Sequence, residues 1–292
     1  MDLVARVQRM PAPGETLTGR SFLANPGGKG ANQAVAAARQ GARVAMAGRV
    51  GDDGFAAQLR ASLAQQGVDG SDVRTTSGES SGVALILVDD AAQNCISVIP
   101  GANGRVTPQD ADELQPHLER STLLLLQLEI PMASVLRAAT LARRAGCRVL
   151  LNPAPAQALP DALWPLLDIL VLNETEAAMY CGLPQVEPHE AEQVALLLRH
   201  RGPGLVLLTR GAEGVAWADE QGTGHVAAPR VRAVDTTAAG DTFIGALAAR
   251  LVQGASVAQA LAHAVNAAAL CVTRPGAQAS MPDRDEVDRF VP

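Results

Sequence analysis

Short apolar runs alternate with amphipathic segments along most of the chain. Near-continuous Val, Leu and Ile runs are typical of strands that are buried on both faces, and they predict strands over residues 43–50, 122–128, 147–151, 168–172 and 204–209. Apolar residues at helical spacing predict helices over residues 30–40, 53–66, 108–120, 132–145, 174–181, 190–201, 240–252, 257–273 and 283–290. Such alternation indicates an α/β fold with a doubly wound, mostly parallel sheet flanked by helices.

Two stretches depart from this alternation. Residues 14–25 and 80–100 alternate apolar and polar positions and carry Gly and Asn turns, which predicts antiparallel strands outside the main sheet. We therefore expect a small β-sheet lid formed by about residues 3–26 and 80–100. Because no repeat, low-complexity tract or linker interrupts the chain, we predict a single domain over residues 1–292.

Composition narrows the possible ligands. Hydrophobic residues make up 48% of the 292 residues but aromatic residues only 2%, so the core is built from small aliphatic side chains and base-stacking platforms are scarce. The 24 Lys and Arg against 30 Asp and Glu give a net charge of −6. Without a basic cluster to neutralise phosphates, the chain is a poor candidate for binding nucleic acid.

The cysteines and the apolar runs argue against several other classes. The cysteines form no CxxC pair, which disfavours a zinc or iron–sulfur site and a disulfide framework; they are Cys95, Cys147, Cys181 and Cys271. No apolar run reaches the roughly 20 residues that span a membrane, and the first residues lack the apolar stretch of a signal peptide. We therefore expect a cytoplasmic protein that does not insert into membranes.

A glycine-rich segment around a lysine, residues 25–32 (NPGGKGAN), opens a predicted helix. Glycines let the backbone approach a ligand closely, and free amides at a helix start attract anions or hydroxyl oxygens. The spacing differs from that of the P-loop, and no Ser or Thr follows Lys29, so we exclude a Walker-type site. A simple strand–helix turn remains an equally open interpretation of this segment.

A second segment, residues 234–245 (VDTTAAGDTFIG), places small residues before an apolar helix and an acid in its first turn. Asp241 is a good helix cap there, but capping does not explain the Ala-Ala-Gly run before it. Such a run leaves backbone N–H groups approachable, as an anion hole requires. An Asp beside it can take a proton from a hydroxyl while the amides hold a phosphoryl group.

Three further segments place polar residues after predicted strands, where α/β sheets bind ligands. Residues 173–176 (NETE) offer oxygens that suit Mg²⁺ or simply cap a helix. Residues 209–214 (TRGAEG) form either a hairpin turn or a loop facing a nucleotide. Glu129, at the end of LQLE, is either an acceptor for two sugar hydroxyls or a solvated strand end.

Together these segments resemble the ribokinase-like carbohydrate kinases of the PfkB type, in order and over essentially the whole chain. The motifs that carry the resemblance are NPGGKGANQAVAAA (25–38), LQLE (126–129), LNPAPA (151–156), NETEA (173–177), DTTAAGDTFIGAL (235–247) and VTRPGAQ (272–278). The glycine-lysine and AAGD segments are the two signatures of the family. The resemblance implies ATP-dependent phosphorylation of the primary hydroxyl of ribose, giving ribose 5-phosphate.

The resemblance also assigns roles to the matching residues. Asp241 would be the catalytic base, beside an anion hole made by the amides of Ala238, Ala239 and Gly240. Sugar hydroxyls would be bound by Asp2, Gly28, Lys29, Gly30, Ala31, Asn32, Glu129 and Asp241. The nucleotide would be contacted by Asn173, Thr209, Arg210, Gly211, Ala212, Glu213, Gly214, Gly240 and Asp241.

The family's cofactors can be assigned in the same way. Asn173 and Glu176 match the element that organises Mg²⁺ through water. A K⁺ or similar monovalent cation would activate the enzyme by shaping the anion hole, at positions matching Asp235, Thr237, Cys271, Arg274, Gly276 and Ser280, several of them through backbone carbonyls. The lid would cover the sugar, and pairing of lid strands would make a homodimer.

The chain departs from the family pattern at its start. The family begins with a buried strand before the residue that matches Asp2, whereas here Asp2 follows Met1 directly. We therefore expect a further strand before residue 1.

Alternative functions remain open from the sequence. The substrate could be another sugar or a nucleoside, as in a fructokinase, deoxyribokinase or adenosine kinase, although few aromatics disfavour a stacked base. A sugar-binding homologue with impaired catalysis is a further alternative, which an intact Asp241 and AAGD run argue against.

Overall fold

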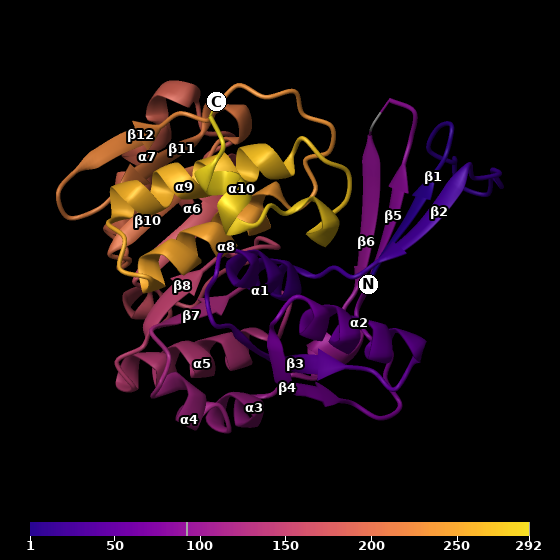
Figure 1. The fold of residues 1–292 in the computed structure, drawn as a ribbon, viewed down its shortest axis with the longest axis horizontal. Coiled ribbons are helices and arrows are strands. Elements are labelled where there is room, and N and C mark those ends of the chain that lie inside the picture. Colours follow the sequence, from indigo (N-terminus) through magenta and orange to yellow (C-terminus); the bar gives the residue numbers. More distant parts are fainter. Residues whose placement is uncertain (92, 292) are drawn as a thin grey trace.

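The computed structural model describes residues 1–91 and 93–291, and its strands form three separate sheets (Figure 1). The largest has the strand order β12-β11-β10-β9-β8-β7. Strands β7 to β10 run parallel, and β11 and β12 continue the sheet antiparallel. The bounds are Leu123–Leu126 for β7, Arg148–Leu151 for β8, Ile169–Asn173 for β9, Leu205–Thr209 for β10, Val215–Ala218 for β11 and Thr223–Val226 for β12.

Helices cover both faces of this sheet. Successive strand residues alternate between two cores, so Leu170 and Leu172 pack on one face while Ile169 and Val171 pack on the other. The first face carries α5 (Met132–Arg144), α6 (Glu174–Cys181) and α7 (Ala191–Arg199), and the second carries α8 (Ala239–Val252) and α9 (Val257–Cys271). The predicted doubly wound α/β fold is therefore confirmed.

A second, two-stranded sheet packs beside this body. Its parallel strands β3 (Ala45–Val50) and β4 (Asp69–Thr75) share a third core with helices α1 (Lys29–Arg39) and α2 (Gly54–Gln65). Within the described residues, β3 pairs only with β4 and β7 pairs only with β8. The strand expected before residue 1 lies outside the described residues and stays a prediction.

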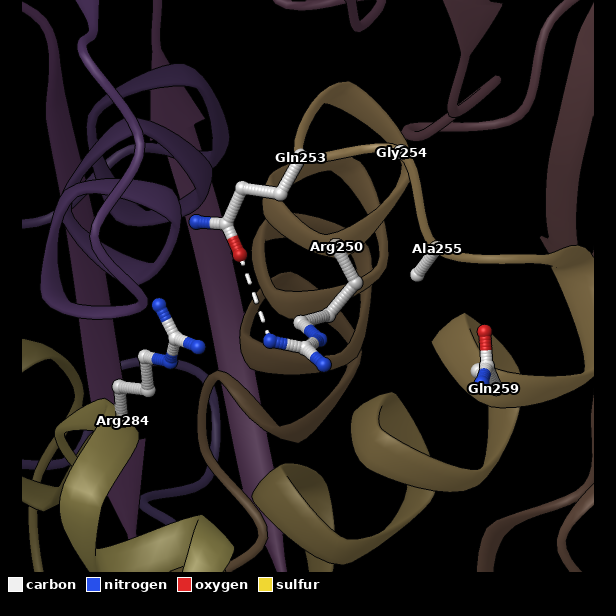
Figure 2. A pocket seen from close by; sticks show the side chains of 6 residues that line it. All are labelled: Arg250, Gln253, Gly254, Ala255, Gln259 and Arg284. Atoms are coloured by element: carbon white, nitrogen blue, oxygen red, sulfur yellow. Dashed lines mark hydrogen bonds between the residues drawn. The ribbon is translucent and has the colours of Figure 1, made fainter.

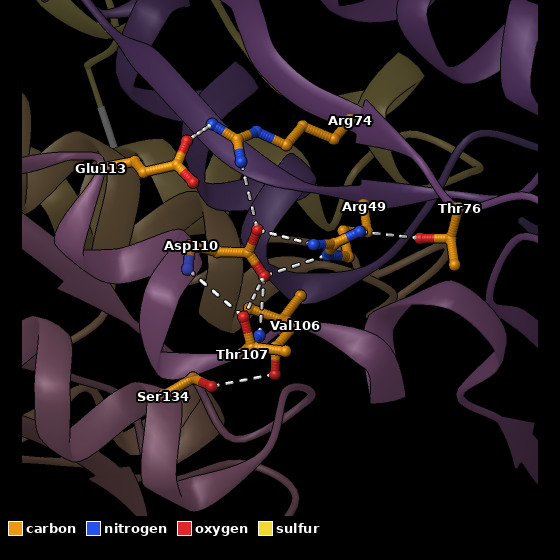
Figure 3. A network of polar contacts seen from close by, with 8 residues as sticks. All are labelled: Arg49, Arg74, Thr76, Val106, Thr107, Asp110, Glu113 and Ser134. Atoms are coloured by element: carbon orange, nitrogen blue, oxygen red, sulfur yellow. Dashed lines mark hydrogen bonds and ion pairs between the residues drawn. The ribbon is translucent and has the colours of Figure 1, made fainter.

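An ion-pair network ties this second sheet to α3 (Pro108–Asp112) (Figure 3). Arg49 of β3 donates twice to the Asp110 carboxylate, at 2.7 and 3.0 Å, and Arg74 of β4 approaches it at 3.4 Å. Burial acts to raise the pKa of Asp110, but the hydrogen bonds from Arg49 and Thr107 outweigh it and hold the pKa low. The charged carboxylate therefore links two strands and a helix.

The third sheet is small and stands at one side of the molecule (Figure 1). Its strand order is β2-β1-β5-β6, with bounds Asp2–Arg6 for β1, Ser21–Asn25 for β2, Val83–Val88 for β5 and Asn94–Ile99 for β6. Strands β1 and β5 are parallel, and the other two pairs are antiparallel. A small, lid-like β-sheet was expected, and its presence is confirmed. It places Asp2 next to the glycine-rich turn before α1.

The predicted helix over residues 108–120 is wrong as one element. It forms two short helices, α3 and α4 (Gln115–Leu118), with a break at residues 113–114. Pro116 lies in the first turn of α4; it has no N–H to donate and its ring disfavours a continuous helix across that position. The remaining short elements are α10 (Arg284–Asp288) and the 3₁₀ turns η1 (Gly101–Arg105), η2 (Trp164–Leu166), η3 (Pro188–Glu190), η4 (Gly211–Glu213) and η5 (Gln278–Ser280).

The helices of residues 1–91 and 93–291 include none that is both long and apolar enough to cross a membrane.

Helices α1 and α8 pack closely against each other, and Gly245 makes this possible. A Cβ at Gly245 would lie 2.4 Å from the Ala36 Cβ and 2.7 Å from two backbone atoms, the Ala37 nitrogen and the Gln33 oxygen. Backbone atoms cannot move aside as a flexible side chain can. A side chain at position 245 would therefore push the two helices apart.

We predict that Gly245→Ala destabilises the protein by about 1–3 kcal/mol, the usual cost of overpacking a core. The measurement is chemical unfolding followed by circular dichroism. Gly54→Ala, at an exposed position in the first turn of α2 with nothing within 4 Å of the new Cβ, is the control and should be neutral or slightly stabilising. Equal stability of both variants would contradict the importance of this close approach.

Candidate active site

The carboxyl ends of the parallel strands bring several predicted residues to one edge of the large sheet. Asn173 ends β9 and Thr209 ends β10, and the two are paired in register. Glu129 follows β7 by three residues. This edge is where open α/β sheets bind ligands.

Helix α8 begins at this edge with an unusual backbone conformation. Ala238, just before the helix, has φ of +60° and is the one non-glycine residue with positive φ in the described chain. An alanine in this left-handed region costs on the order of 1 kcal/mol. Of the nearby amides, that of Ala239 donates to the Thr236 carbonyl at 3.2 Å. Those of Ala238 and Gly240 have no acceptor within the part of the chain that the structure describes, so they can bind an anion.

Asp241, in the first turn of α8, is buried and held by two amide side chains of α1. The Asn32 Nδ2 donates to its Oδ2 at 3.0 Å, and the Gln33 Nε2 donates to its Oδ1 at 3.0 Å. Burial raises the pKa of Asp241, and nearby Lys29 and the two hydrogen bonds oppose this rise. The carboxylate is thus fixed in orientation and is more basic than an exposed Asp.

Sequence reasoning assigned no role to Gln33, although it lies inside the motif NPGGKGANQAVAAA (25–38). Gln33 is fully buried and also donates to the Asn152 Oδ1 at 3.1 Å, while it accepts from the Gln127 Nε2 at 2.5 Å. Gln278 extends the network by donating to the Asn32 Oδ1 at 3.1 Å. Residues from five motifs that are far apart in the chain, 25–38, 126–129, 151–156, 235–247 and 272–278, therefore meet in this network.

The glycine-rich turn before α1 packs against two carboxylates. A Cβ at Gly27 would lie 2.1 Å from the Asp2 Oδ2, and Gly28 has φ of +90°, so glycine is required at both positions. The Lys29 amide donates to the Glu129 Oε2 at 2.8 Å. Asp2 and Glu129 therefore both lie against this turn. Ala31, by contrast, packs against the third core.

Several carboxyl groups of the site are desolvated together. Burial raises the pKa of Asp2, Glu129 and Glu176, as it does for Asp241. In each case nearby Asp241 adds to the rise, and the positive charge of Lys29 acts against it. These groups and Lys29 therefore share one electrostatic environment, although their positions range from residue 2 to residue 241.

Asn173 and Glu176 form a reciprocal cap at the start of α6. The backbone N–H of Asn173 donates to the Glu176 Oε2 at 2.9 Å, and the backbone N–H of Glu176 donates to the Asn173 Oδ1 at 2.8 Å. No group of three or more His, Cys, Asp or Glu side chains suited to a metal ion occurs among the described residues. The Glu176 Oε1 has no hydrogen-bond donor among the described residues. This oxygen suits contact with the water shell of a hydrated Mg²⁺ rather than direct coordination of the ion by several protein ligands.

The segment at residues 209–214 forms a tight turn between β10 and β11. The Arg210 amide donates to the Gly214 carbonyl at 2.8 Å, and the Thr209 hydroxyl donates to the Leu172 carbonyl at 3.3 Å. Gly211, Ala212 and Glu213 are exposed at the tip of the turn. The Arg210 side chain lies 3.5 Å from Glu174. The turn is thus both a hairpin and an accessible loop next to Asn173.

Asp235 joins the two loops in which the monovalent cation is expected. Its Oδ1 accepts from the Thr237 amide and its Oδ2 from the Gly276 amide, both at 2.9 Å. Burial favours a higher pKa for Asp235, but hydrogen bonds from Thr237 and Gly276 outweigh it and lower the pKa. An ionised carboxylate between two loops suits a bound cation.

The other residues of this predicted cation site lie in or beside the same loops. The Cys271 Sγ lies 3.0 Å from the Ser280 Oγ and accepts from the Thr242 hydroxyl at 3.2 Å. The Arg274 guanidinium pairs with Glu286 at 2.6 Å, so only its backbone is available to a cation.

The chain is similar to known proteins over nearly its whole length. The model of the pfkB family carbohydrate kinases matches residues 1–284. A ribokinase of Haemophilus influenzae is 39% identical over 290 residues, covering 99% of this chain and 95% of that protein. A deoxyribokinase of Salmonella typhi is 38% identical over 292 residues, covering 100% and 95%.

Solved structures show the same likeness. The structure of Arabidopsis thaliana ribokinase complexed with ribose and ATP superimposes with a TM-score of 0.93 at 31% identity, covering 99% of this chain and 96% of that one. A ribokinase of Thermotoga maritima gives a TM-score of 0.90 at 34% identity, with coverages of 98% and 94%. The chain belongs to the pfkB family of carbohydrate kinases and is a sugar kinase with the ribokinase-like fold.

Proposed function

We propose that this kinase transfers the γ-phosphoryl group of ATP to the primary hydroxyl of D-ribose and releases ribose 5-phosphate. The observation that carries the proposal is the buried Asp241, held by Asn32 and Gln33 beside the free amides of Ala238 and Gly240. A base and an anion hole at the same helix start supply what phosphoryl transfer needs, which is positioning and charge stabilisation.

In this reaction Asp241 takes the proton of the primary hydroxyl as its oxygen attacks the γ-phosphorus. The raised pKa of Asp241 makes it a better proton acceptor. The anion hole consists of the backbone amides of Ala238, Ala239 and Gly240. The Ala239 amide, which donates to the Thr236 carbonyl at 3.2 Å, would donate to a phosphoryl oxygen instead when ATP is bound. The positive end of α8 adds to this stabilisation.

The sugar lies between the glycine-rich turn and the small sheet. Asp2 and Glu129 accept hydrogen bonds from its secondary hydroxyls, while Lys29, Gly28, Gly30 and Asn32 line the rest of the pocket. Two desolvated carboxylates are better suited to bind a substrate that carries pairs of hydroxyl groups than an apolar or aromatic substrate. The small sheet acts as a lid that excludes water, so that ATP is not hydrolysed instead.

The nucleotide lies along the carboxyl edge, contacted by Asn173 and by the turn at residues 209–214. Asn173 and Glu176 would hold the water shell of the Mg²⁺ that accompanies ATP, and this ion neutralises phosphate charge when bound. The loops joined by Asp235 would hold K⁺ or a similar cation. Its charge would stabilise the loop conformation that presents the amides before α8.

A substrate panel tests the proposed acceptor. We expect kcat/KM to be highest for ribose, and lower by at least about tenfold for 2-deoxyribose, because a site built to bind a hydroxyl rejects the analogue that lacks it. ADP release is measured with ribose, 2-deoxyribose, fructose and adenosine, each with and without K⁺, and K⁺ should raise the rate. A preference for 2-deoxyribose or fructose would contradict the ribose assignment, but it would not contradict the assignment as a sugar kinase.

The role of Asp241 is tested by Asp241→Asn. We expect kcat to fall by about 10²–10⁴-fold, while the sugar Kd from calorimetry changes little. In the unchanged enzyme kcat/KM should rise with pH through an acid limb that lies above the ordinary Asp pKa, because burial raises the pKa of Asp241. Asp161→Asn, at an exposed carboxylate, is the control. A loss of less than tenfold in Asp241→Asn would refute its role as base.

We further propose that the protein is a homodimer through the small sheet. Both faces of this sheet expose large apolar side chains: Phe22 is 65% and Ile96 is 51% exposed, and the register places them on opposite faces. Apolar surface of this kind marks an interaction site.

Sedimentation velocity of Phe22→Ser and Ile96→Ser tests the dimer. The parent protein should sediment as a dimer, and the variant on the interface face should shift to monomer because it loses buried apolar area. Leu197→Ser on α7, whose side chain is 54% exposed, should leave the dimer intact. A monomeric parent protein, or a dimer unaffected by both variants, would overturn this arrangement.

A further inference from the structure

The two amide side chains that hold the Asp241 carboxylate have a fixed polarity. An ionised carboxylate can only accept hydrogen bonds, so an amide that faces it must present its NH₂ group. Asn32 presents this group to Oδ2 and Gln33 presents it to Oδ1, both at 3.0 Å. The carbonyl oxygen of each amide then points elsewhere. Because both side chains are buried, that oxygen needs a donor from the protein.

The donor to the Asn32 oxygen is Gln278. The Gln278 Nε2 donates to the Asn32 Oδ1 at 3.1 Å, and the Gln278 side chain is itself buried. The Gln278 Oε1 accepts from the Ser62 hydroxyl of α2 at 3.1 Å. A chain of hydrogen bonds therefore runs in one direction, from a hydroxyl through two amides to the Asp241 carboxylate. Reversing either amide would place two oxygens against each other.

The segment that carries Gln278 is anchored on both sides. Before it, the Gly276 amide donates to the Asp235 Oδ2 at 2.9 Å. After it, the Ser280 hydroxyl donates to the Ala277 carbonyl at 2.7 Å. Gln278 lies between these contacts, at the start of the 3₁₀ turn η5. Its backbone is thus held in place, so its side chain can fix the orientation of a neighbour.

Asn32 depends on this support more than Gln33 does. The Gln33 Oε1 accepts from Gln127, and its Nε2 also donates to the Asn152 Oδ1 at 3.1 Å. Gln33 therefore has two further side-chain partners that keep its orientation. Within the described residues, the Asn32 side chain has one partner besides the carboxylate, and that partner is Gln278.

We propose that Gln278 is a positioning residue for phosphoryl transfer, because its hydrogen bond fixes the orientation in which Asn32 donates to Asp241. Without this bond the Asn32 oxygen is buried without a donor, which is costly, and the amide turns to find one. The Asp241 carboxylate then loses one of its two donors and part of its fixed orientation. The inference rests on the proposed role of Asp241 as the base, but it does not depend on which sugar is phosphorylated.

The far end of α1 offers a matched control residue, Gln40. It is buried and donates to the Pro282 carbonyl at 2.9 Å, so it also ties α1 to the segment between α9 and α10. Its backbone carbonyl accepts from the Gln253 Nε2 at 3.0 Å, and Figure 2 shows the Gln253 side chain at the end of α8. Gln40 therefore matches Gln278 in residue type, burial and the segment involved, but it follows the last residue of α1, far from the carboxylate.

Steady-state kinetics of Gln278→Met test the inference, with the preferred sugar of the substrate panel. Methionine keeps the length of the side chain but cannot donate a hydrogen bond. We expect kcat to fall at least about fivefold, because a small misplacement of a reacting group is costly. The KM for ATP should change less than about twofold. Gln40→Met should keep the kcat of the parent, although both variants lose a buried hydrogen bond and should unfold at a lower temperature.

A double-variant cycle tests whether Gln278 acts through Asn32. Asn32→Leu removes the amide and keeps the size of the side chain, and in this background Gln278→Met should lower kcat by less than about twofold further. A larger further loss, a smaller than fivefold fall in Gln278→Met alone, or an equal fall in Gln40→Met overturns the inference. If Gln278→Met fails to fold, as judged by thermal unfolding, Gln278→Asn replaces it, because its shorter side chain does not reach Asn32.

Asp241→Asn, measured alongside, separates this inference from the proposed function. A loss of less than tenfold in that variant removes the base itself, and with it the premise of the inference. A large loss in Asp241→Asn together with an unchanged kcat in Gln278→Met overturns the positioning role alone.

Discussion

The close packing of α1 on α8 is the contact on which the active site depends. The Asp241 carboxylate belongs to α8, but both of its hydrogen-bond donors, Asn32 and Gln33, belong to α1. Their 3.0 Å distances are possible because Gly245 has no side chain to separate the two helices. The proposed anion hole lies at the same end of α8, and the glycine-rich turn lies at the same end of α1. One interface therefore sets the positions of the proposed base, the amides before α8 and the glycine-rich turn together.

The strands that could be predicted from sequence are those in which burial leaves a strong pattern. β8, β9 and β10 consist almost wholly of Leu, Ile and Val because helices cover both faces, and their predicted ranges agree closely with the structure. β4, β11 and β12 were missed. The buried strand β11, VAWA, is only four residues long. The sequences of β4 and β12, DGSDVRT and TGHV, carry no apolar pattern, and these two strands pair at sheet edges, where one neighbouring strand and partial exposure suffice. The helix over residues 108–120 failed for a local reason, Pro116, which outweighed the amphipathic spacing.

The site shows a similar division between local and non-local information. Glycine spacing and an acid after Ala-Ala-Gly are local signals, and they indicated Lys29, Gly240 and Asp241 directly. Gln33 could not be found in this way, because a glutamine inside a helix has the appearance of a surface residue, and its partner Asp241 is 208 positions away. The left-handed backbone of Ala238 was equally hidden, since alanine gives no hint of positive φ. Only the tertiary structure identifies hydrogen bonds between distant residues and backbone conformations of this kind.

The electrostatics of the site favour backbone amides over charged side chains as the proposed anion-binding groups. The chain carries a net charge of −6, and burial raises the pKa of Asp2, Glu129, Glu176 and Asp241, with Lys29 as the side-chain cation that acts on all of them. These carboxylates, where ionised, repel a triphosphate, and a second lysine would pair with one of them and lower the pKa of the proposed base. In the proposed mechanism, amides at the start of α8 attract the phosphoryl oxygens without carrying a full charge, so they leave the pKa of Asp241 raised. The positive φ of Ala238 thus fits the proposed function, because it occurs where approachable N–H groups can bind an anion without a charged side chain that would lower the pKa of the proposed base.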